Sequence, residues 1–150
     1  DWPRARQEIR VGTSDRRRLP LIYIVGPFRG PTPLDVRLNV EHARTYGLIV
    51  AKAGGYPIIP HTMTADFDKQ LDDQFWLDGT MEMLSRCDAI ALIPHWRLST
   101  GARAEKDAAE VFGLPEWDFT ALGQNNDEGL ADWIAAIKPG RLVPYVTLVG

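Results

Sequence analysis

The stretch "LPLIYIVGPFRG", residues 19–30, decides the fold of this chain. It places a short apolar run, rich in β-branched residues, directly before Gly26 and Pro27. A run of this length that ends at glycine and proline is typical of a buried strand that leads into a loop. Two later stretches, "YPIIP" at 56–60 and "DAIALIP" at 88–94, repeat the pattern. The sequence therefore predicts at least three short strands of one buried sheet.

Stretches with helical spacing lie between these strands. Apolar residues recur at steps of three and four over 35–53, 75–86 and 99–112. Gly113 and Pro115 form a stop signal after the last of them. Strands that alternate with helices predict right-handed crossovers and a mostly parallel sheet that is covered on both faces. We therefore expect an α/β fold.

The C-terminal part of the chain is less regular. Residues 117–122, "WDFTAL", are a possible fourth strand, and residues 130–137 form a last amphipathic helix. The tail "RLVPYVTLVG", residues 141–150, is expected either to pair as a strand or to lie on a neighbouring subunit.

Composition favours one domain. A chain of 150 residues with 45% hydrophobic content is long enough for one core and too short for two ordinary domains. Six arginines precede the first apolar run, so we expect residues 1–18 to be a basic extension outside the core. This extension is either solvated, docked on a partner, or an arm for nucleic acid. Residues 19–150 are then a single α/β domain.

The sequence also excludes several classes of protein. No apolar run approaches the ~18–20 residues of a membrane span, and the N-terminal part lacks the apolar stretch of a secretory signal. We expect a soluble, cytoplasmic protein with no membrane partner. The single cysteine, Cys87, excludes an internal disulfide and a multi-cysteine metal site. A net charge of −3 gives no overall attraction to nucleic acid, so nucleic acid is not an expected partner.

The loops after the three predicted strands are expected to share one edge of the sheet. In open parallel sheets, ligands bind at the carboxyl ends of the strands. The polar and aromatic residues of these three loops are Phe28, Arg29, His61, His95, Trp96 and Ser99. Their concentration at one edge is the main argument from the sequence for a binding site.

The stretch "RLSTGARAEKDAAE", residues 97–110, adds a carboxylate to that edge. A helical side chain leans toward the helix N-terminus, so Glu105 is expected to lie over the small residues Gly101 and Ala102. Ser99 or Thr100 would cap the helix. Glu105 then either complements the helix dipole, worth ~0.3–1 kcal/mol, or attacks the anomeric carbon of a sugar to form a glycosyl-enzyme intermediate.

Other residues at this edge have alternative interpretations. Arg29 is a candidate anion ligand or one half of a structural ion pair, and Phe28 or Trp96 could stack on a base or pack in the core. Arg103 is expected to pair with Asp107 on the helix surface. The polar candidates for a metal site are His61, His95, Asp66 and Asp68. They lack the spacing of known metal motifs, so no metal is expected.

Two stretches together resemble a known family. "IYIVGPFRG", residues 22–30, and "LSRCDAIALIPHWRLSTGARAEKDAAEVFGLP", residues 84–115, are similar to the nucleoside 2-deoxyribosyltransferase-like superfamily, most closely to its small phage and bacterial branch of uncharacterised domains. The similarity covers roughly residues 21–118. It implies a three-layer α/β/α sandwich with a flavodoxin-like or Rossmann-like sheet of about five strands. It also implies cleavage of the N-glycosidic bond of a (deoxy)nucleoside or its 5′-monophosphate, by a hydrolase or a deoxyribosyltransferase.

The resemblance assigns roles to individual residues. It places Glu105 at the position of the nucleophile, and Ser99 where nucleotide hydrolases of the superfamily hold the 5′-phosphate. It implies no metal or organic cofactor, a small-molecule nucleotide or nucleoside as the partner, and a homodimer or larger homo-oligomer. The expected substrate-binding residues are Tyr23, Gly26, Pro27, Phe28, Arg29, His61, Thr80, Trp96, Ser99 and Gly101.

One position departs from the family pattern. The family commonly has an aspartate eight residues before the aspartate that begins the third predicted strand, and this chain has Thr80 eight residues before Asp88. Asp78 lies about 200° around the helix from Thr80 and is not a simple substitute. Either Thr80 takes a weaker hydrogen-bonding role, or the chain is a non-catalytic module that binds or senses nucleotides.

Overall fold

The structure is a computed structural model, and it describes residues 8–12, 19–64, 67, 70–121, 127–138 and 145–149. The chain divides into two compact units. Residues 19–138 form the larger unit, and the strands near the two ends of the chain form the smaller one. Within the described residues, no helix is both long and apolar enough to cross a membrane.

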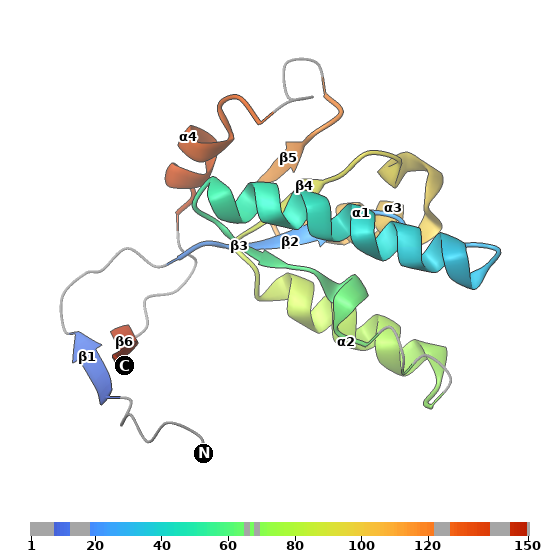
Figure 1. Cartoon of the computed structure of the whole chain (residues 1–150), viewed down its shortest axis with the longest axis horizontal. Helices are drawn as coiled ribbons and strands as arrows, with labels where there is room; N and C mark the ends of the chain where they lie inside the picture. The colour runs from blue at the N-terminus through green and yellow to red at the C-terminus, as the bar shows by residue number, and fades with distance from the viewer. Residues whose placement is uncertain are drawn as a thin grey trace. The chain divides into compact units, whose positions relative to one another are not determined.

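The larger unit is built on one parallel sheet (Figure 1). Its strands, in spatial order, are β3 (Tyr56–Ile58), β2 (Leu21–Val25), β4 (Ala89–Leu92) and β5 (Glu116–Asp118). Each neighbouring pair is parallel. The expected α/β class and parallel sheet are confirmed, but the sheet has four strands and not the expected five.

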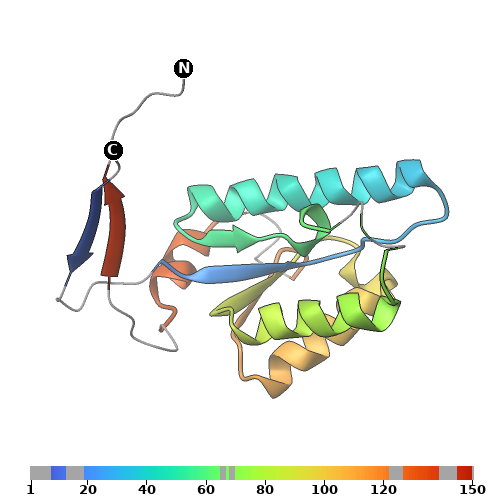
Figure 2. The same cartoon turned by 90° about the horizontal axis from the view of Figure 1, so that it is seen from below.

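Helices cover both faces of this sheet, as Figure 2 shows. The four helices are α1 (Pro33–Lys52), α2 (Asp73–Ser85), α3 (Thr100–Val111) and α4 (Leu130–Ala135). Buried residues of α1 and α4 pack on one face, and buried residues of α2 and α3 pack on the other. This arrangement confirms the expected three-layer α/β/α sandwich.

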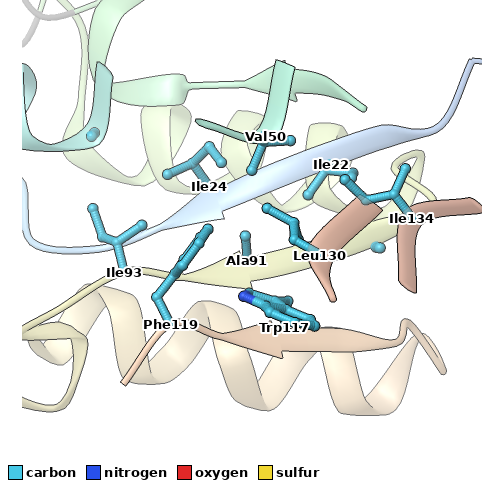
Figure 3. Close-up of a cluster of buried hydrophobic side chains, with 11 residues drawn as sticks. Ile22, Ile24, Val50, Ala91, Ile93, Trp117, Phe119, Leu130 and Ile134 are labelled. Carbon is cyan, nitrogen blue, oxygen red and sulfur yellow. The ribbon is translucent and has the colours of Figure 1, made fainter. Parts of the chain in front are cut away.

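The alternation of side chains along the strands explains why their sequence is apolar throughout. Ile22 and Ile24 of β2 join the cluster under α1 and α4, where they pack with Leu130 (Figure 3). Tyr23 and Val25 belong to the cluster under α2 and α3. A strand that is buried on both faces needs apolar residues at every position.

The carboxyl ends of β2 and β4 lie side by side. The helices that follow these two strands lie on opposite faces of the sheet. The chain runs from β2 to α1 on one face, and from β4 to α3 on the other. Gly26 is required at this point, because a Cβ there would lie 2.4 Å from the side chain of Ile93. Ligands of open α/β sheets bind at such a switch point.

The smaller unit is a two-stranded antiparallel ribbon. β1 (Glu8–Gly12) pairs with β6 (Tyr145–Val149), with Glu8 opposite Val149. The tail therefore pairs as one of the two alternatives predicted, but its partner is a strand within the segment assigned to the basic extension. Because β6 pairs there and not with the four-stranded sheet, that sheet lacks a fifth strand. The larger unit ends at Lys138.

Candidate active site

Helix α3 begins at the carboxyl edge of the sheet and carries Glu105. Ser99 is its N-cap, and the Ser99 Oγ accepts a hydrogen bond of 3.2 Å from the backbone N–H of Ala102. The cap predicted from the sequence is therefore formed by Ser99. Glu105 is half-buried, on a helix whose Ala102 and Ala109 are buried against the sheet.

The Tyr23 side chain brings a hydroxyl group to Glu105 from the central strand β2. Tyr23 is fully buried, on the face that α2 and α3 cover. Its hydroxyl has no hydrogen bond within 3.5 Å and at a favourable angle to any described residue. The Glu105 carboxylate and the Thr80 hydroxyl are nevertheless close enough to change the pKa of Tyr23. Side-chain oxygens from β2, α2 and α3 therefore converge at one place.

Burial changes the acidity of both Glu105 and Tyr23. It raises the pKa of Glu105 to about 7, and the nearby Tyr23 hydroxyl lowers this pKa and so opposes the shift. Burial and the adjacent Glu105 carboxylate raise the pKa of Tyr23, so its hydroxyl stays protonated. A carboxyl group that ionises near neutral pH beside a phenol that keeps its proton is suited to nucleophilic or acid–base chemistry.

Thr80 belongs to this group of side chains. It is half-buried on α2, its Oγ1 donates a hydrogen bond of 2.8 Å to the carbonyl of Leu77, and its hydroxyl lowers the pKa of Tyr23. Asp78 instead accepts a hydrogen bond of 2.7 Å from the side chain of Gln74 on the exposed side of α2. Asp78 therefore does not replace the carboxylate that the resemblance leads one to expect at position 80.

A second group of expected site residues meets where β2 and β3 end. His61, in the short helix η1 (Pro60–Thr62), is only 5% exposed, and its Nε2 lies 3.0 Å from the carbonyl oxygen of Gly26. The ring of Phe28 packs edge-to-face against the imidazole, with centroids 5.6 Å apart. Burial lowers the pKa of His61, although the carbonyl groups of Gly26 and Pro27 oppose this shift. Gly26, Pro27, Phe28 and His61 thus form one contact group.

Arg29 lies on the outer side of the same loop. Its guanidinium is 3.5 Å from the Asp73 carboxylate in the first turn of α2, and the two side chains are 70% and 63% exposed. An ion pair this exposed contributes about 0–1 kcal/mol, so it is easily exchanged for a ligand anion. Both interpretations of Arg29 made from the sequence therefore stay compatible with its position.

Trp96 packs in the core and presents little surface. It is 8% exposed in the short helix η2 (Trp96–Leu98), and its ring has the Arg97 guanidinium 4.6 Å and the Lys106 amine 5.8 Å from its centroid. These contacts favour packing over base stacking. Gly101, in contrast, is exposed, and a Cβ there would meet only the Ser99 Oγ, at 3.9 Å.

The hydrogen-bond partners of Arg103 differ from Asp107, the partner expected from the sequence. Its guanidinium donates hydrogen bonds to the Arg97 carbonyl at 2.8 Å and to the Thr100 Oγ1 at 3.4 Å. The side chain therefore turns back to the start of α3, because a backbone carbonyl is available there as an acceptor. It adds a positive charge at the end of the helix that already attracts anions.

His42 is a residue of this edge that the sequence reasoning missed. It lies on α1, its Nε2 is 3.2 Å from the Pro94 carbonyl, and its ring centroid is 6.0 Å from that of His95. His95 has a left-handed backbone conformation, with φ of 72°. This conformation is energetically unfavourable for residues other than glycine, and residues that adopt it cluster at functional sites. A histidine inside a helix carries no signal of its own in the sequence, so only the fold reveals this contact.

All three histidines of the chain therefore lie at the carboxyl edge. Among the residues that the structure describes, no three His, Cys, Asp or Glu side chains are arranged to hold a metal ion. Asp66 and Asp68, the other two candidate metal ligands in the sequence, lie outside the described residues.

Comparison with known proteins assigns the chain to a family. A comparison with curated proteins finds no significant match. A family model matches residues 20–118, which contain the four strands of the sheet, α1 to α3, and the Tyr23, Thr80 and Glu105 side chains. The description of that family is "Domain of unknown function (DUF7768)". Because the match covers well over half of the chain, the protein belongs to the DUF7768 family.

Proposed function

We propose that the protein cleaves the N-glycosidic bond of a (deoxy)nucleoside or its 5′-monophosphate, with Glu105 as the nucleophile. The observation that carries the proposal is the half-buried Glu105 carboxylate beside the buried Tyr23 hydroxyl at the ligand-binding edge of the sheet. The resemblance of residues 22–30 and 84–115 to the nucleoside 2-deoxyribosyltransferase-like superfamily supports the same reaction.

The reaction needs an ionised carboxylate at the anomeric carbon. The Glu105 carboxylate attacks C1′, the C1′–N bond breaks, and the base leaves with the bonding electrons and takes up a proton. The resulting glycosyl ester on Glu105 is then resolved by water in a hydrolase, or by a second base in a transferase. Negative charge close to C1′ stabilises the oxocarbenium-like transition state more than the ground state. The nearby Tyr23 hydroxyl lowers the pKa of the carboxyl group and so favours its ionised form.

The start of α3 supports a 5′-monophosphate as the preferred substrate. Helix N-termini bind phosphate through free backbone N–H groups and the helix dipole. The Ser99 Oγ already accepts a hydrogen bond from Ala102, so its own proton is available for a phosphate oxygen. Arg103 at the same turn, and Arg29 on the neighbouring loop, add positive charge.

The resemblance implies an oligomeric assembly, and the composition favours a cytoplasmic location. The protein then acts as a cytoplasmic homodimer or larger homo-oligomer that needs neither metal nor organic cofactor. Sedimentation of the purified chain tests the assembly, and activity in the presence of a chelator tests the metal.

A second candidate is a nucleotide-binding or sensing module without turnover. The observation that favours it is Thr80, which lowers the pKa of Tyr23 and stands where the superfamily that the chain resembles commonly has an aspartate. A threonine hydroxyl orients a sugar or base more weakly than a carboxylate does. Such a module binds nucleotides at the same edge but releases no base.

One experiment separates the two candidates. The protein is incubated with ribo- and deoxyribonucleosides and their 5′-monophosphates, and released base is measured by chromatography. Base release by the wild type that is lost in Glu105→Gln, and kept in the control variant Asp107→Asn on the exposed side of the same helix, supports the enzyme. Tight binding by the wild type without any release contradicts the enzyme and supports the binding module.

A further inference from the structure

His61 is a buried imidazole at the carboxyl edge, and only one of its two ring nitrogens has a hydrogen-bond partner. Its Nε2 lies 3.0 Å from the carbonyl oxygen of Gly26. A carbonyl only accepts hydrogen bonds, so Nε2 carries the proton. The Nδ1 atom is buried and has no hydrogen-bond partner among the described residues.

The imidazole is held in its neutral form. Burial lowers the pKa of His61, the Gly26 and Pro27 carbonyls oppose this shift, and nearby His42 adds to the lowering. With the proton on Nε2, the neutral ring leaves Nδ1 as a lone-pair acceptor. A buried acceptor without a partner costs about 1–3 kcal/mol, so such atoms in native proteins call for an explanation.

We propose that the Nδ1 of His61 accepts a hydrogen bond from a hydroxyl or amino group of the bound nucleotide, and that His61 thereby selects ligands that carry this donor. This inference rests on the proposed function, because it takes a nucleotide as the ligand. His61 follows β3 at the edge of the sheet where β2 and β4 also end. The half-buried Phe28 ring packs edge-to-face against the imidazole, so a ligand that reaches His61 also lies close to Phe28.

Two substitutions separate the roles of the two ring nitrogens. His61→Gln places an amide nitrogen near the position of Nε2, so it keeps a donor for Gly26 and removes the acceptor at Nδ1. His61→Asn places an oxygen near the position of Nδ1, so it keeps the acceptor and loses the contact with Gly26. If ligand selection follows the Nδ1 acceptor, His61→Asn retains it and His61→Gln does not.

The test is the binding of matched nucleotide pairs, measured by calorimetry with the full chain. The pairs are dAMP with 2′-deoxynebularine 5′-monophosphate, dCMP with 2′-deoxyzebularine 5′-monophosphate, and each deoxynucleotide with its 2′,3′-dideoxy counterpart, so that each pair differs in one amino or hydroxyl group. We expect one of these changes to weaken binding to the wild type at least fivefold, and to weaken binding to His61→Gln less than twofold. Equal discrimination by the wild type and His61→Gln overturns the inference.

A measurement on the wild type alone covers the case in which His61→Gln does not fold. Nitrogen-15 NMR of the imidazoles, assigned with His42→Gln and His95→Gln, is expected to show His61 protonated at Nε2 only, with an Nδ1 resonance that shifts when the preferred nucleotide binds. Protonation at Nδ1, or an Nδ1 resonance that does not respond to a nucleotide that binds, overturns the inference.

The outcomes also separate this inference from the proposed function. If none of the nucleotides binds to the wild type, the proposed function fails and this inference fails with it. If the wild type binds nucleotides and releases base while His61→Gln keeps full discrimination, only the inference about His61 is wrong.

Discussion

Glu105 changes its protonation state near neutral pH, because burial raises its pKa to about 7. As the proposed nucleophile, Glu105 must be ionised, so kcat/KM is expected to rise with pH up to about 7 and to level off above it. The measurement is the pH–rate profile between pH 5.5 and 8.5 with the preferred substrate. A profile that is flat, or that falls as the pH rises through this range, contradicts the role of Glu105.

Tyr23→Phe provides a second test of the same pair. The Tyr23 hydroxyl lowers the pKa of Glu105, so its removal is expected to shift the rising limb of the profile to higher pH. An unchanged or lowered apparent pKa in Tyr23→Phe argues that the two groups do not interact during turnover.

His61 makes a contribution to stability that depends on pH. Its pKa is lowered in the folded state, so below about pH 6.5 the unfolded chain takes up a proton that the folded chain does not. The free energy of unfolding of the wild type, relative to His61→Gln, is therefore expected to decrease as the pH falls below about 6.5. Urea unfolding of both proteins at pH 5.5 and 7.5 measures the difference. A difference that is independent of pH contradicts the buried neutral imidazole.

The wild type must be compared with the His61 variant, because Glu105 changes the free energy of unfolding with pH in the opposite direction to His61. The raised pKa of Glu105 lets the folded state bind more protons between its unfolded value near 4.3 and about 7. Its contribution therefore increases stability as the pH falls through that window. The effect is common to the wild type and His61→Gln, and it cancels in their difference.

The start of α3 leaves room for a Cβ at position 101, on the side where the proposed ligand would bind. Gly101→Ala is expected to stabilise the fold by about 0.5–1 kcal/mol, because glycine is unfavourable inside a helix and a Cβ at 101 meets only the Ser99 Oγ, at 3.9 Å. The same methyl group would narrow the space through which Glu105 reaches the ligand, so KM is expected to rise. Chemical denaturation and steady-state kinetics measure the two effects. A stabilised variant with unchanged kinetics shows that the ligand does not use this space.

The contact between the ends of β2 and β4 is expected to tolerate no side chain at position 26. Gly26→Ala places a Cβ 2.4 Å from Ile93, and overpacking of this kind costs about 1–3 kcal/mol. Ile93→Ala removes the atoms that clash and costs stability by itself. In denaturation experiments, the double variant is expected to be less destabilised than the sum of the two single variants. Additive costs contradict the close approach.

At the scale of the whole molecule, both buried apolar clusters lie within residues 19–138. A chain cut to these residues is therefore expected to keep its helical circular dichroism signal and a cooperative thermal transition. A two-stranded ribbon, in contrast, is marginally stable by itself. Loss of cooperative unfolding in the shortened chain contradicts the division into two units.

The regular elements of the larger unit follow from local patterns. Apolar runs closed by glycine or proline predict β2, β3 and β4, and helical spacing with a serine cap predicts α3, because these signals depend on neighbours a few residues apart. The pairing of β1 with β6 joins residues such as Glu8 and Val149, and no local pattern selects a partner at that separation.

The site follows from the sequence only in part. The carboxyl edge and Glu105 are predictable from strand order and helix geometry. The convergence of Tyr23, Thr80 and Glu105 depends on how α2 and α3 pack on β2. Arg103 turns to a carbonyl six residues earlier and not to Asp107 as expected, because the turn before α3 places an acceptor within its reach. Contacts of this kind depend on tertiary packing and not on the spacing of residues in the sequence.

The most direct test of the central claim is to look for the covalent intermediate on Glu105. The protein is mixed with its preferred substrate, quenched in acid within the first turnover, and examined by mass spectrometry of the intact chain and its peptides. We expect a mass increase equal to the glycosyl group, located on Glu105 and absent from Glu105→Gln. Base release with the glycosyl group on another residue, or undiminished base release by Glu105→Gln, would contradict it.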